Sequence, residues 1–460
     1  MPLISPEYLE QNKALHSRGG YGAGSFRWSE LVTNLRDELG ATTVLDYGCG
    51  QGTLGYALGN PEWFSEYDPA IPGKDETPEN SVDLVICTDV LEHIEPENLN
   101  EVLEHLRKLA KKGLLAVISI RPASKTLDDG RNAHLSLKTP DEWRVVLEER
   151  FDIVSWATFP GEIVVVLKRL HTIDDIKVQS AVSDTIRFEN AVRNSDIVKR
   201  RIYLHPRHEK RVAIACYGPS LKYAIPDIIV ERNAGALVVS VSGAHDFLIE
   251  HGVVPDIHVD VDPRIHKADF TKNPHPKIQY WMASCCHPKT IDNLLGYDLT
   301  LWHVHNSDED VRILDEVDRD GFLVGGGGSV GCRVVSLMYT QGYRDFSIFG
   351  MDCSFAEDGE QHAGPHSGKV QKGLKAKCGG RWYKTSGTLV AIGKGFMNVV
   401  DALEKVSQMH DEPRPYDGDC IRVQLGGDGL LAMMCAQRSK DVVLKVDNPE
   451  DFTKEAAEAA

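Results

Sequence analysis

A run of closely spaced glycines near residue 50 lies between a β-branched stretch and a helical pattern. In VLDYGCGQGTLGYAL the glycines are Gly48, Gly50 and Gly52, and Asp46 ends the expected strand. Glycines let a ligand approach the backbone, and the N-terminus of the following helix adds positive potential. A dinucleotide-binding G-x-G-x-x-G motif requires its third glycine at position 53, which is a threonine here. The spacing therefore disfavours a hydride-transfer enzyme.

The glycine motif resembles the first motif of S-adenosylmethionine-dependent methyltransferases of the Rossmann-like type. The resemblance implies that Asp46 orients the amino acid end of this cofactor and that the glycines pass beneath that end. It also implies that an acid ending the second strand holds the ribose hydroxyls. Asp68 lies 22 positions beyond Asp46, where a βαβ unit would place that acid. The expected cofactor is therefore S-adenosyl-L-methionine.

Two further segments resemble later motifs of the same family. VDLVICTDVLEHI resembles the fourth motif, so Asp89 is expected to contact the cofactor and, with Glu92 and His93, to face the methyl group or the substrate. RNAHLSLKTPDEWRVVLEERFDIV resembles the segment in which a His-Leu pair precedes a helix, so His134 is expected to reach the acceptor. The resemblance makes Asp89, His93 and His134 the expected catalytic residues, in a reaction that needs alignment and one general base. Hydrogen bonding within a loop is the alternative role for the two histidines.

The fourth-motif segment and the net charge both bear on the methyl acceptor. TDVLEHI lacks the Asn- or Asp-Pro-Pro-aromatic tetrad of DNA amino-methyltransferases and the Pro-Cys of cytosine carbon methylases. The chain carries 51 basic and 68 acidic residues, and its net charge of −17 repels a phosphate backbone. Nucleic acid is therefore disfavoured, and we expect a small-molecule, sugar or glycan, or protein acceptor.

A second set of candidate binding residues begins near residue 218. In IACYGPSLKYAI, Gly218 follows a strand pattern and Ser220 opens a helical pattern, for which an ordinary capped helix start is the alternative interpretation. In DIHVDVDP, Asp260 and Asp262 end a β-branched strand. Carboxylates one residue apart on a strand share a face, so this pair is the expected site for Mg²⁺ that bridges phosphates.

The segment FLVGGGGSVGCRVVSLMY combines four consecutive glycines with a helical pattern. Because Ser329 leads directly into apolar residues at helical spacing, the run predicts a strand-to-helix junction and not a hinge. The backbone N–H groups of Gly327 and Gly328, with Ser329 as cap or donor, are expected to hold an anion. The lysine that follows the glycines in a Walker loop is absent, which argues against a loop that binds only the phosphates of ATP.

The loop GMDCSFAEDGEQHAGPHSGK follows a later strand and gathers polar side chains. Open α/β sheets place their sites at strand ends, so Asp352 is the expected general base for a hydroxyl acceptor. A solvated surface loop is the alternative. Weaker candidates in and after the loop are Asp358, His362 and His366, and the lysines that could attract an anionic substrate are Lys369, Lys372, Lys375 and Lys377.

Together, GYGPSL, SGAHDFLIEHGVVPD, VDVDP, the glycine run and WYKTS resemble one superfamily over roughly residues 187–435. It contains the archaeal 6-hydroxymethylpterin pyrophosphokinases (MptE-like) and the Maf flagellin glycosyltransferases, and more distantly bacterial sialyltransferases. These activities share a nucleotide-linked phosphate, so the resemblance implies a nucleotide or nucleotide-sugar donor, with Mg²⁺ as a candidate cofactor. The fusion of this segment to a methyltransferase also resembles proteins of bacteriophage and prophage genomes.

Two series of strand and helix patterns must position these residues. Strand patterns alternate with helical ones in both halves of the chain, which predicts an α/β fold with two Rossmann-like domains and parallel sheets. A helix is expected over 99–110, with Gly113 as its stop. The expected segments are a methyltransferase domain over 1–170, a helical linker over 171–210, a nucleotide-dependent transferase domain over 211–446 and a flexible tail over 447–460. Neither a signal peptide nor a membrane-spanning run is found, so we expect a cytoplasmic protein, in the host cytoplasm if a phage encodes it.

Three hypotheses for function follow from these patterns. The first is a bifunctional transferase that combines S-adenosylmethionine-dependent methyl transfer with glycosyltransferase-like use of a nucleotide-linked donor. The second replaces the glycosyl step with 6-hydroxymethylpterin pyrophosphokinase-like activity that uses ATP and Mg²⁺. The third makes the C-terminal domain a catalytically inactive docking module.

Overall fold

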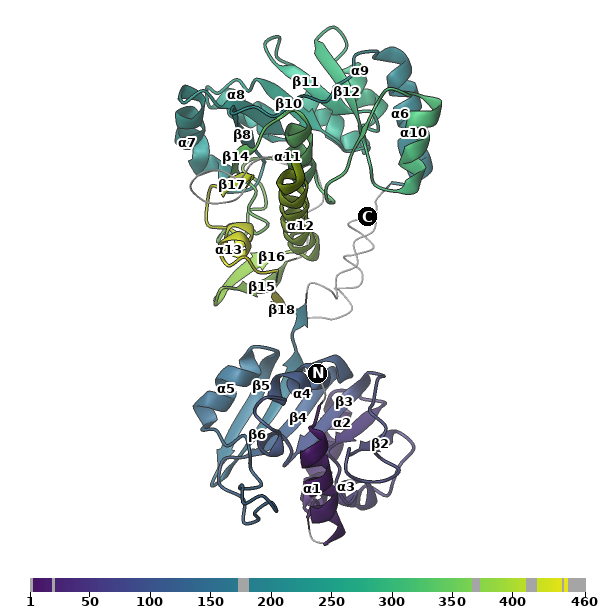
Figure 1. Ribbon diagram of the computed structural model, residues 1–460, viewed down its shortest axis with the longest axis vertical. Helices are drawn as coiled ribbons and strands as arrows, with labels where there is room; N and C mark the ends of the chain where they lie inside the picture. Colours follow the sequence, from purple (N-terminus) through teal and green to yellow (C-terminus); the bar gives the residue numbers. More distant parts are fainter. Residues whose placement is uncertain are drawn as a thin grey trace. The chain divides into compact units, whose positions relative to one another are not determined.

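The computed structural model describes residues 3–18, 21–172, 182–365, 373–410, 420–440 and 442–445. The chain forms two compact units, Met1–His171 and Thr172–Ala460, which Figure 1 colours from purple to blue and from teal to yellow. The expected tail 447–460, His366, Lys369 and Lys372 lie outside the described residues. No helix in the described part of the chain is long and apolar enough to cross a bilayer.

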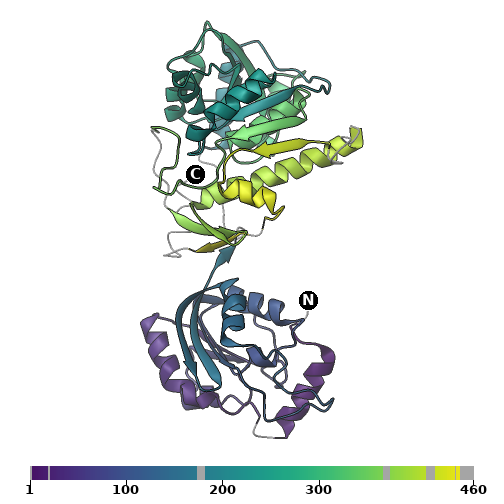
Figure 2. The same cartoon turned by 90° about the vertical axis from the view of Figure 1, so that its left-hand side faces the viewer.

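The first unit is built on one six-stranded sheet (Figure 2). Its strands are β1 (Val44–Tyr47), β2 (Phe64–Tyr67), β3 (Val82–Thr88), β4 (Ala110–Ser119), β5 (Phe151–Phe159) and β6 (Glu162–Arg169). Its helices are α1 (Pro6–Ser17), α2 (Ser29–Glu38), α3 (Thr53–Ala57), α4 (Leu99–Leu109) and α5 (Pro140–Glu148), with the short 3-10 helices η1 (Ser25–Trp28) and η2 (Leu91–His93). The strand order is β2-β1-β3-β4-β6-β5. The first four are parallel, and β6 runs antiparallel to both β4 and β5.

Helices cover both faces of this sheet. The central strands are buried along most of their length and mainly apolar, as is usual for parallel strands covered on two sides. On one face α4 and α5 bury Leu103, Leu106 and Trp143 against the strands. On the other face α2 and α3 bury Val32 and Leu54. The sheet is therefore closed on both sides, and the loops at its strand ends are left to form a site.

Helix α4 shows where the sequence pattern succeeds and where it fails. All of the apolar residues expected on its inner face are buried: Leu99, Val102, Leu103, Leu106, Leu109 and Ala110. The prediction that Gly113 stops the helix is wrong, because α4 ends at Leu109 and Gly113 lies inside β4. Pairing explains the difference: Ala110 already lies beside Val82 of β3, and Gly113 lies beside Leu84 after a bulge.

The second unit contains an eight-stranded sheet whose neighbouring strands all pair in parallel. Its strands are β8 (Arg211–Ala215), β9 (Leu237–Val241), β10 (Ile257–Asp260), β11 (Gln279–Ala283), β12 (Asp298–Val304), β13 (Leu323–Val324), β14 (Asp345–Phe349) and β17 (Arg422–Leu425). The order is β13-β12-β11-β10-β9-β8-β14-β17. The predicted α/β class with two Rossmann-like parallel sheets is thereby confirmed.

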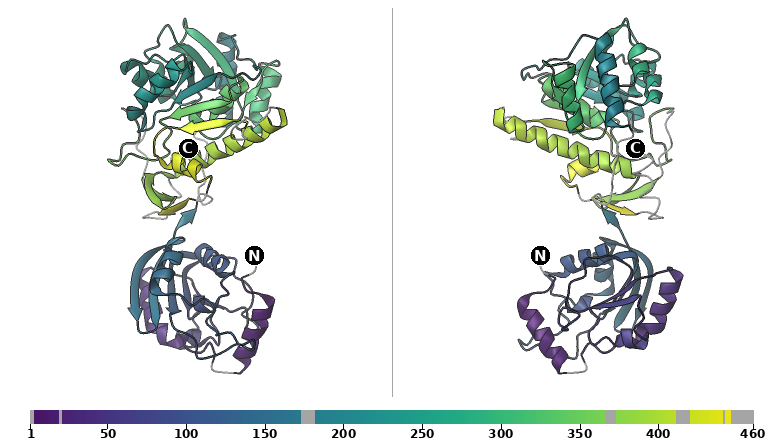
Figure 3. Two further views of the ribbon diagram at one scale, coloured as in Figure 1. Left: turned by 60° about the vertical axis from the view of Figure 1, so that its left-hand side comes forward. Right: turned by 90° about the vertical axis from the view of Figure 1, so that its right-hand side faces the viewer.

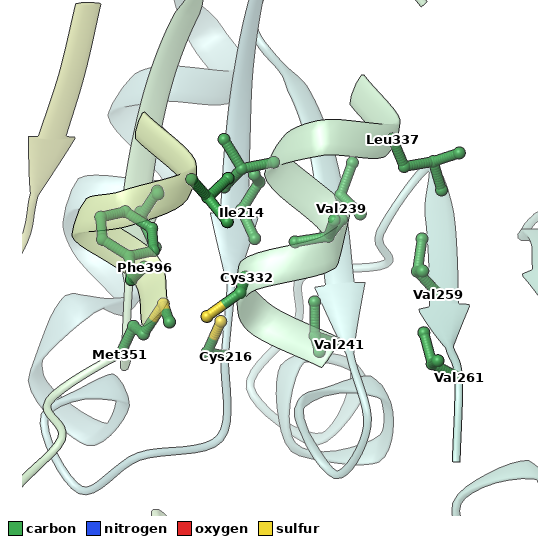
Figure 4. Packing of buried hydrophobic residues seen from close by; sticks show 14 of the residues in the cluster. Ile214, Cys216, Val239, Val241, Val259, Val261, Cys332, Leu337, Met351 and Phe396 are labelled. Carbon is green, nitrogen blue, oxygen red and sulfur yellow. The ribbon is translucent and has the colours of Figure 1, made fainter. Parts of the chain in front are cut away.

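Helices also cover both faces of the second sheet. They are α6 (Asp184–Ile197), α7 (Leu221–Asn233), α8 (Ala244–Glu250), α9 (Pro288–Asp292), α10 (Arg312–Glu316), α11 (Val330–Thr340), α12 (Gly387–His410) and α13 (Leu430–Ala436), with the 3-10 helices η4 (Ile265–Thr271) and η5 (Asp308–Val311). Leu221 of α7 and Leu248 of α8 pack on one face. On the other face, Cys332 of α11 and Phe396 of α12 join the strand residue Ile214 in one large apolar cluster (Figure 4).

A small second sheet was not expected from the sequence. Its order is β16-β15-β18-β7, with β7 (His171–Thr172), β15 (Leu374–Cys378), β16 (Arg381–Thr385) and β18 (Val443–Lys445). Strand β15 runs antiparallel to both β16 and β18. Figure 3 shows this sheet below the long helix α12. Strands so far apart in sequence pair through long-range contacts, which residue periodicity does not report.

The range 171–210, expected as a helical linker, holds one described helix, α6, followed by extended chain. The Nδ2 group of Asn194 on α6 donates at 2.8 Å to the carbonyl oxygens of both Ser284 and Cys286. Arg201 then pairs beside Leu301 of β12. From Thr172 onward the chain is counted with the second unit, so α6 is part of that unit's packing.

Candidate active site

The strand order of the first unit creates a natural binding position. The chain passes from β1 outward to β2 and then returns to β3 on the other side of β1. In open α/β sheets, ligands bind beyond the carboxyl ends of the strands at such a reversal. Asp46 lies near the end of β1, and Asp89 directly follows β3. The structure therefore brings these two predicted residues to the same edge of the sheet.

Asp46 is a buried acid without a partner. Its side chain is 1% exposed, and neither carboxylate oxygen has a hydrogen-bond partner. Burial raises the pKa of Asp46 to about 8, the neighbouring Glu66 carboxylate adds to this rise, and Lys74 opposes it. Glu66 lies directly beside Asp46 in the register of β1 and β2. A buried acid in this state calls for a cationic or hydrogen-bonding ligand, because leaving it unsatisfied costs free energy.

The loop after β1 requires glycine at several positions, because its backbone conformation and close packing do not suit other residues. Gly48, Gly50 and Gly52 have φ values of 78°, 52° and 73°, in the left-handed region that favours glycine. A Cβ atom on Gly50 would lie 2.4 Å from the carbonyl oxygen of Gly22. That same oxygen accepts a hydrogen bond from the Gln51 N–H at 2.9 Å. The segment around Gly22 therefore closes directly onto the loop.

Asp68 supports the glycine loop from the end of β2. Its Oδ2 accepts from the Gly50 N–H at 2.9 Å, and its Oδ1 accepts from the Ala70 N–H at 2.9 Å. These contacts fix the conformation of the loop. Each carboxylate oxygen can accept a second bond, so the contact with ribose hydroxyls stays a prediction beside this structural role.

Sequence reasoning missed the adjacent Glu66 and Lys74, which form a 2.6 Å ion pair.

Asp89 lies at the rim of the same edge. It has a left-handed backbone with φ of 56°, which is uncommon for a residue other than glycine. Its Oδ2 accepts from the Arg27 guanidinium at 3.2 Å, and Arg27 also reaches Glu162 at 3.0 Å. Burial raises the pKa of Asp89, and the positive charge of Arg27 counteracts the rise. Arg27 was missed because nothing in the motifs links it to β3.

His93 and His134 come together from separate segments. Their ring centroids lie 4.7 Å apart in an edge-to-face arrangement. The Tyr21 hydroxyl lies 3.3 Å from Nδ1 of His93. Burial lowers the pKa of His93 to about 4, with a further contribution from His134. His93 is thus held neutral, and the structure places the two predicted histidines next to each other.

Glu92, which precedes His93 in the fourth motif, is fully buried. Its Oε1 accepts from the Ser119 N–H at the end of β4, at 3.0 Å. Burial raises the pKa of Glu92 to about 8, and the Asp89 carboxylate adds to the rise. The EH pair of the fourth motif therefore places one buried acid and one half-buried, neutral histidine at the strand ends.

The second unit has its own reversal of strand order, between β8 and β14. Gly218 and Ser220 follow β8, and Asp352 follows β14. Oδ2 of Asp352 accepts from the Ser220 N–H at 3.0 Å. A Cβ atom on Gly218 would lie 2.5 Å from that carboxylate oxygen. The structure thus brings Gly218, Ser220 and Asp352 into one cluster at the position where ligands bind in such sheets. Burial raises the pKa of Asp352, although the Ser220 hydrogen bonds oppose this.

Asp260 and Asp262 do not share a strand face, because β10 ends at Asp260. Oδ1 of Asp260 accepts from the N–H groups of Val261 and Asp262, at 2.7 and 3.2 Å. Asp262 is paired with Arg264 at 2.7 Å, which holds the pKa of Asp262 below its usual value although burial alone would raise it. The Mg²⁺ role of the pair stays a prediction, and it would require Arg264 to give way to the ion.

The four-glycine run lies between β13 and α11, a strand-to-helix junction. Ser329 is the N-cap of α11, and its side chain accepts from the Cys332 N–H at 3.3 Å. A Cβ atom on Gly327 would lie 2.8 Å from Cβ of Cys332. The loop is therefore packed on its own helix. Beside Gly328 a Cβ atom would meet no atom within 4 Å, so there is open space on that side for a ligand.

Comparison with protein families assigns the two units separately. Residues 23–150 match the model described as a methyltransferase domain, and residues 188–358 match the model described as 6-hydroxymethylpterin diphosphokinase MptE-like. The chain contains a methyltransferase domain and an MptE-like domain. A comparison with curated proteins gave no match.

Solved structures similar to this chain include two methyltransferases. One is the 1,6-didemethyltoxoflavin-N1-methyltransferase of Burkholderia thailandensis with bound 1,6-didemethyltoxoflavin and S-adenosylhomocysteine, at 16% identity and a TM-score of 0.29, over 37% of this chain and 92% of that one. Another is the magnesium protoporphyrin IX methyltransferase of Synechocystis with bound S-adenosylhomocysteine, at 18% identity and a TM-score of 0.25, over 32% of this chain and 83% of that one.

Proposed function

We propose that the methyltransferase domain uses S-adenosyl-L-methionine and that Asp46 receives its amino acid end. The observation that carries the proposal is the buried Asp46 carboxylate, which has no hydrogen-bond partner and lies beside the glycine loop at the reversal of strand order. An ammonium group would satisfy such an acid with both charge and hydrogen bonds. Both methyltransferase structures named above contain bound S-adenosylhomocysteine.

The residues around Asp46 fit such a cofactor. The loop of Gly48, Gly50 and Gly52 has no side chains to keep a ligand from the backbone. Asp68 lies at the end of β2, where it would accept hydrogen bonds from the ribose hydroxyls. When bound, the cofactor supplies an electrophilic methyl group on a positively charged sulfur. Asp68 and Asp89, and Asp46 once a cation beside it favours its ionised form, provide negative potential around that charge. The protein's own part is then mainly to exclude water and to align the acceptor.

The acceptor side of the site is formed by Asp89, His93 and His134. We propose a small-molecule, sugar or glycan, or protein acceptor, because the net charge of −17 opposes nucleic acid. A neutral histidine can accept the proton that an acceptor loses. His93 is neutral because burial lowers its pKa to about 4. Action in the cytoplasm, of a host if the protein is phage-encoded, belongs to the same proposal.

For the MptE-like domain we propose a transferase that binds a nucleotide-linked phosphate, with glycosyl transfer in the Maf manner as the first candidate. The cluster of Gly218, Ser220 and Asp352, together with Ser329 at the glycine loop, supports it. Pyrophosphoryl transfer from ATP with Mg²⁺ is the second candidate, and the family model matched over 188–358 favours it. An inactive docking module would not need a buried acid at the reversal between β8 and β14.

Isothermal titration tests both parts of the proposal. The wild-type protein should bind S-adenosylmethionine with one site per chain, and Asp46→Asn should weaken binding by about 10- to 100-fold, the worth of a charge-assisted hydrogen bond. Asp37→Asn is the control, because Asp37 is exposed on α2. If the wild type gives no heat, the methyltransferase proposal is wrong.

For the second unit, titrations with ATP, CMP-sugar and UDP-sugar, with and without Mg²⁺, distinguish the candidates. Binding of a nucleotide sugar favours glycosyl transfer. Mg²⁺-dependent binding of ATP alone favours pyrophosphoryl transfer. Binding of none of them favours the docking module.

A further inference from the structure

Three side chains with metal-binding atoms converge in the first unit. One carboxylate oxygen of Glu92 and one ring nitrogen each from His93 and His134 all lie within 4.8 Å of one another. Within the described ranges, this is the one group of three or more such residues at this spacing. Two of its members come from η2 after β3, and the third comes from the loop between β4 and α5, so the fold itself brings them together.

The hydrogen bonds of the two imidazoles fix their tautomers. Nδ1 of His93 lies 2.8 Å from the carbonyl oxygen of Ala133, and Nδ1 of His134 lies 2.5 Å from that of Arg121. A carbonyl oxygen only accepts, so each Nδ1 must carry the proton. Each Nε2 is then left with a free lone pair. A backbone carbonyl that holds Nδ1–H is the usual support of a metal-binding histidine.

Glu92 gives a second and independent indication. It is 0% exposed, and its Oε1 is satisfied by the Ser119 N–H. Its Oε2 is buried and has no hydrogen-bond partner. A purely structural carboxylate would have both oxygens satisfied, since an unpaired buried acceptor is costly. A cation bound by all three side chains would satisfy the buried Glu92 oxygen, and each imidazole has one free nitrogen to offer it.

We propose that Glu92, His93 and His134 bind one divalent transition-metal ion. Two imidazoles and one carboxylate favour Zn²⁺, Mn²⁺ or Fe²⁺ over Mg²⁺ and Ca²⁺, which prefer oxygen ligands alone. Three protein ligands leave coordination positions open, as in catalytic sites. Two further carboxylates, Asp89 and Glu162, act on Glu92 and raise its pKa, and the single Arg27 pairs with both of them at 3.2 and 3.0 Å. The balance of charge around the three side chains therefore favours a cation.

This proposal rests on the proposed methyl transfer and narrows its acceptor to an oxygen nucleophile. An acceptor hydroxyl at an open metal position would lose its proton more readily. Because the free nitrogens of both imidazoles then bind the ion, neither histidine acts as the general base. The proton passes to solvent, and the oxygen forms a bond to the methyl carbon. The sulfur–carbon bond of the sulfonium breaks, and its electron pair stays on sulfur as a neutral thioether. No oxidant or reductant is needed.

The test is metal binding by the full chain after removal of metal with a chelator. Calorimetric titration with Zn²⁺ and absorption titration with Co²⁺ should both show one site per chain in the wild type. His134→Ala and Glu92→Gln should weaken Zn²⁺ binding by at least about tenfold, as expected when a ligand is lost. His205→Ala is the matched control, because His205 is an exposed histidine of the second unit.

Folding and cofactor binding are checked on the same proteins. Zn²⁺ should raise the melting temperature of the wild type and the control but not that of His134→Ala, as binding to the folded state alone requires. Absence of stoichiometric Zn²⁺ binding in the wild type, or equal binding by His134→Ala, would overturn the metal site. S-adenosylmethionine titration of the wild type and of His134→Ala separates the two proposals. Absence of cofactor binding by the wild type would contradict the proposed function, whereas absence of Zn²⁺ binding by a wild type that binds the cofactor would contradict only the metal site.

Discussion

At the scale of single residues, the site is defined by buried acids that destabilise the protein when no ligand is bound. Asp46 and Glu92 are both buried, each with at least one unpartnered oxygen, and burial raises the pKa of each to about 8. Residues of this kind reduce the stability of the free protein and become favourable once a cation or donor arrives. Their presence at one sheet edge is the clearest sign that this edge binds a ligand.

Replacing Asp46 should therefore stabilise the ligand-free protein while it weakens cofactor binding. The folded-state pKa of about 8 lies above the unfolded value of 3.8. The folded protein then holds a proton that the unfolded chain has lost, so this group's contribution to stability declines as pH rises from about 4 to about 8. Asp46→Asn should raise the free energy of unfolding by about 1–3 kcal/mol at pH 8 and by less at pH 5.

Urea unfolding of the ligand-free protein at these two pH values measures the effect, with Asp37→Asn as the exposed control. A variant that loses stability at pH 8, or gains equally at both pH values, would show that Asp46 is satisfied in the free protein.

At the scale of elements, glycine loops and strand ends do most of the positioning. The loop after β1 is fixed from two sides, by Asp68 through the Gly50 N–H and by Gly22 through the Gln51 N–H. Such a loop cannot shift to admit a side chain without losing one of these contacts.

Gly50→Ala tests this packing against a matched control. Gly50 has φ of 52° and a Cβ atom there would lie 2.4 Å from the Gly22 carbonyl oxygen, whereas Gly59 has φ of 81° with no atom within 4 Å of its Cβ position. Both alanine variants carry a backbone cost of about 1 kcal/mol, but only Gly50→Ala must move the loop. Calorimetry should show at least about tenfold weaker S-adenosylmethionine binding for Gly50→Ala and little change for Gly59→Ala. Equal affinities in the two variants would contradict the tight loop.

The sequence predicted the elements well where a local pattern decides them. The apolar face of α4 and the alternation of strands with helices follow from periodicity, and the strand-to-helix junction at Ser329 follows from the residues on either side of the glycines. The end of α4, the small sheet of β15, β16, β18 and β7, and the pairing of Asp262 with Arg264 were not predicted. Those features depend on strand register and on which side chains meet, and neither is written in local spacing.

The candidate site was predicted in the same uneven way. Asp46, Asp89, His93 and His134 were placed by motif, and the structure brings them to one sheet edge. Arg27 and Tyr21 were missed because they reach the site through tertiary contacts from a segment that carries no motif. Glu66 and Lys74 were missed although they flank Asp68, because their ion pair beside Asp46 depends on the pairing of β1 with β2. A stretch such as YGAGSFRW, with glycines beside an aromatic and a basic residue, is the signal that could have drawn attention to Tyr21 and Arg27.

At the scale of the whole molecule, each unit contains its own sheet, its own reversal of strand order and its own buried acid beyond it. Every residue assigned to the methyl-transfer site belongs to Met1–His171, and every residue of the β8–β14 cluster belongs to Thr172–Ala460. Two sites that share no residues are expected to bind their ligands independently.

Cross-titration of the full chain measures this independence. Asp352→Asn should change the affinity for S-adenosylmethionine by less than about twofold, the range expected for sites without shared partners. Asp46→Asn should likewise leave the affinity for the nucleotide that the second unit binds unchanged. A change of about tenfold in either direction would show coupling between the two units.

The most direct measurement of the central claim compares S-adenosylhomocysteine with 5′-methylthioadenosine, which lacks the amino acid end, on the wild type and on Asp46→Asn. If Asp46 receives the amino group, the wild type should bind S-adenosylhomocysteine more tightly by at least about tenfold, and Asp46→Asn should abolish most of that difference. The same preference in both proteins would show that Asp46 does not face the cofactor's amino acid end, and the account of this site would be wrong.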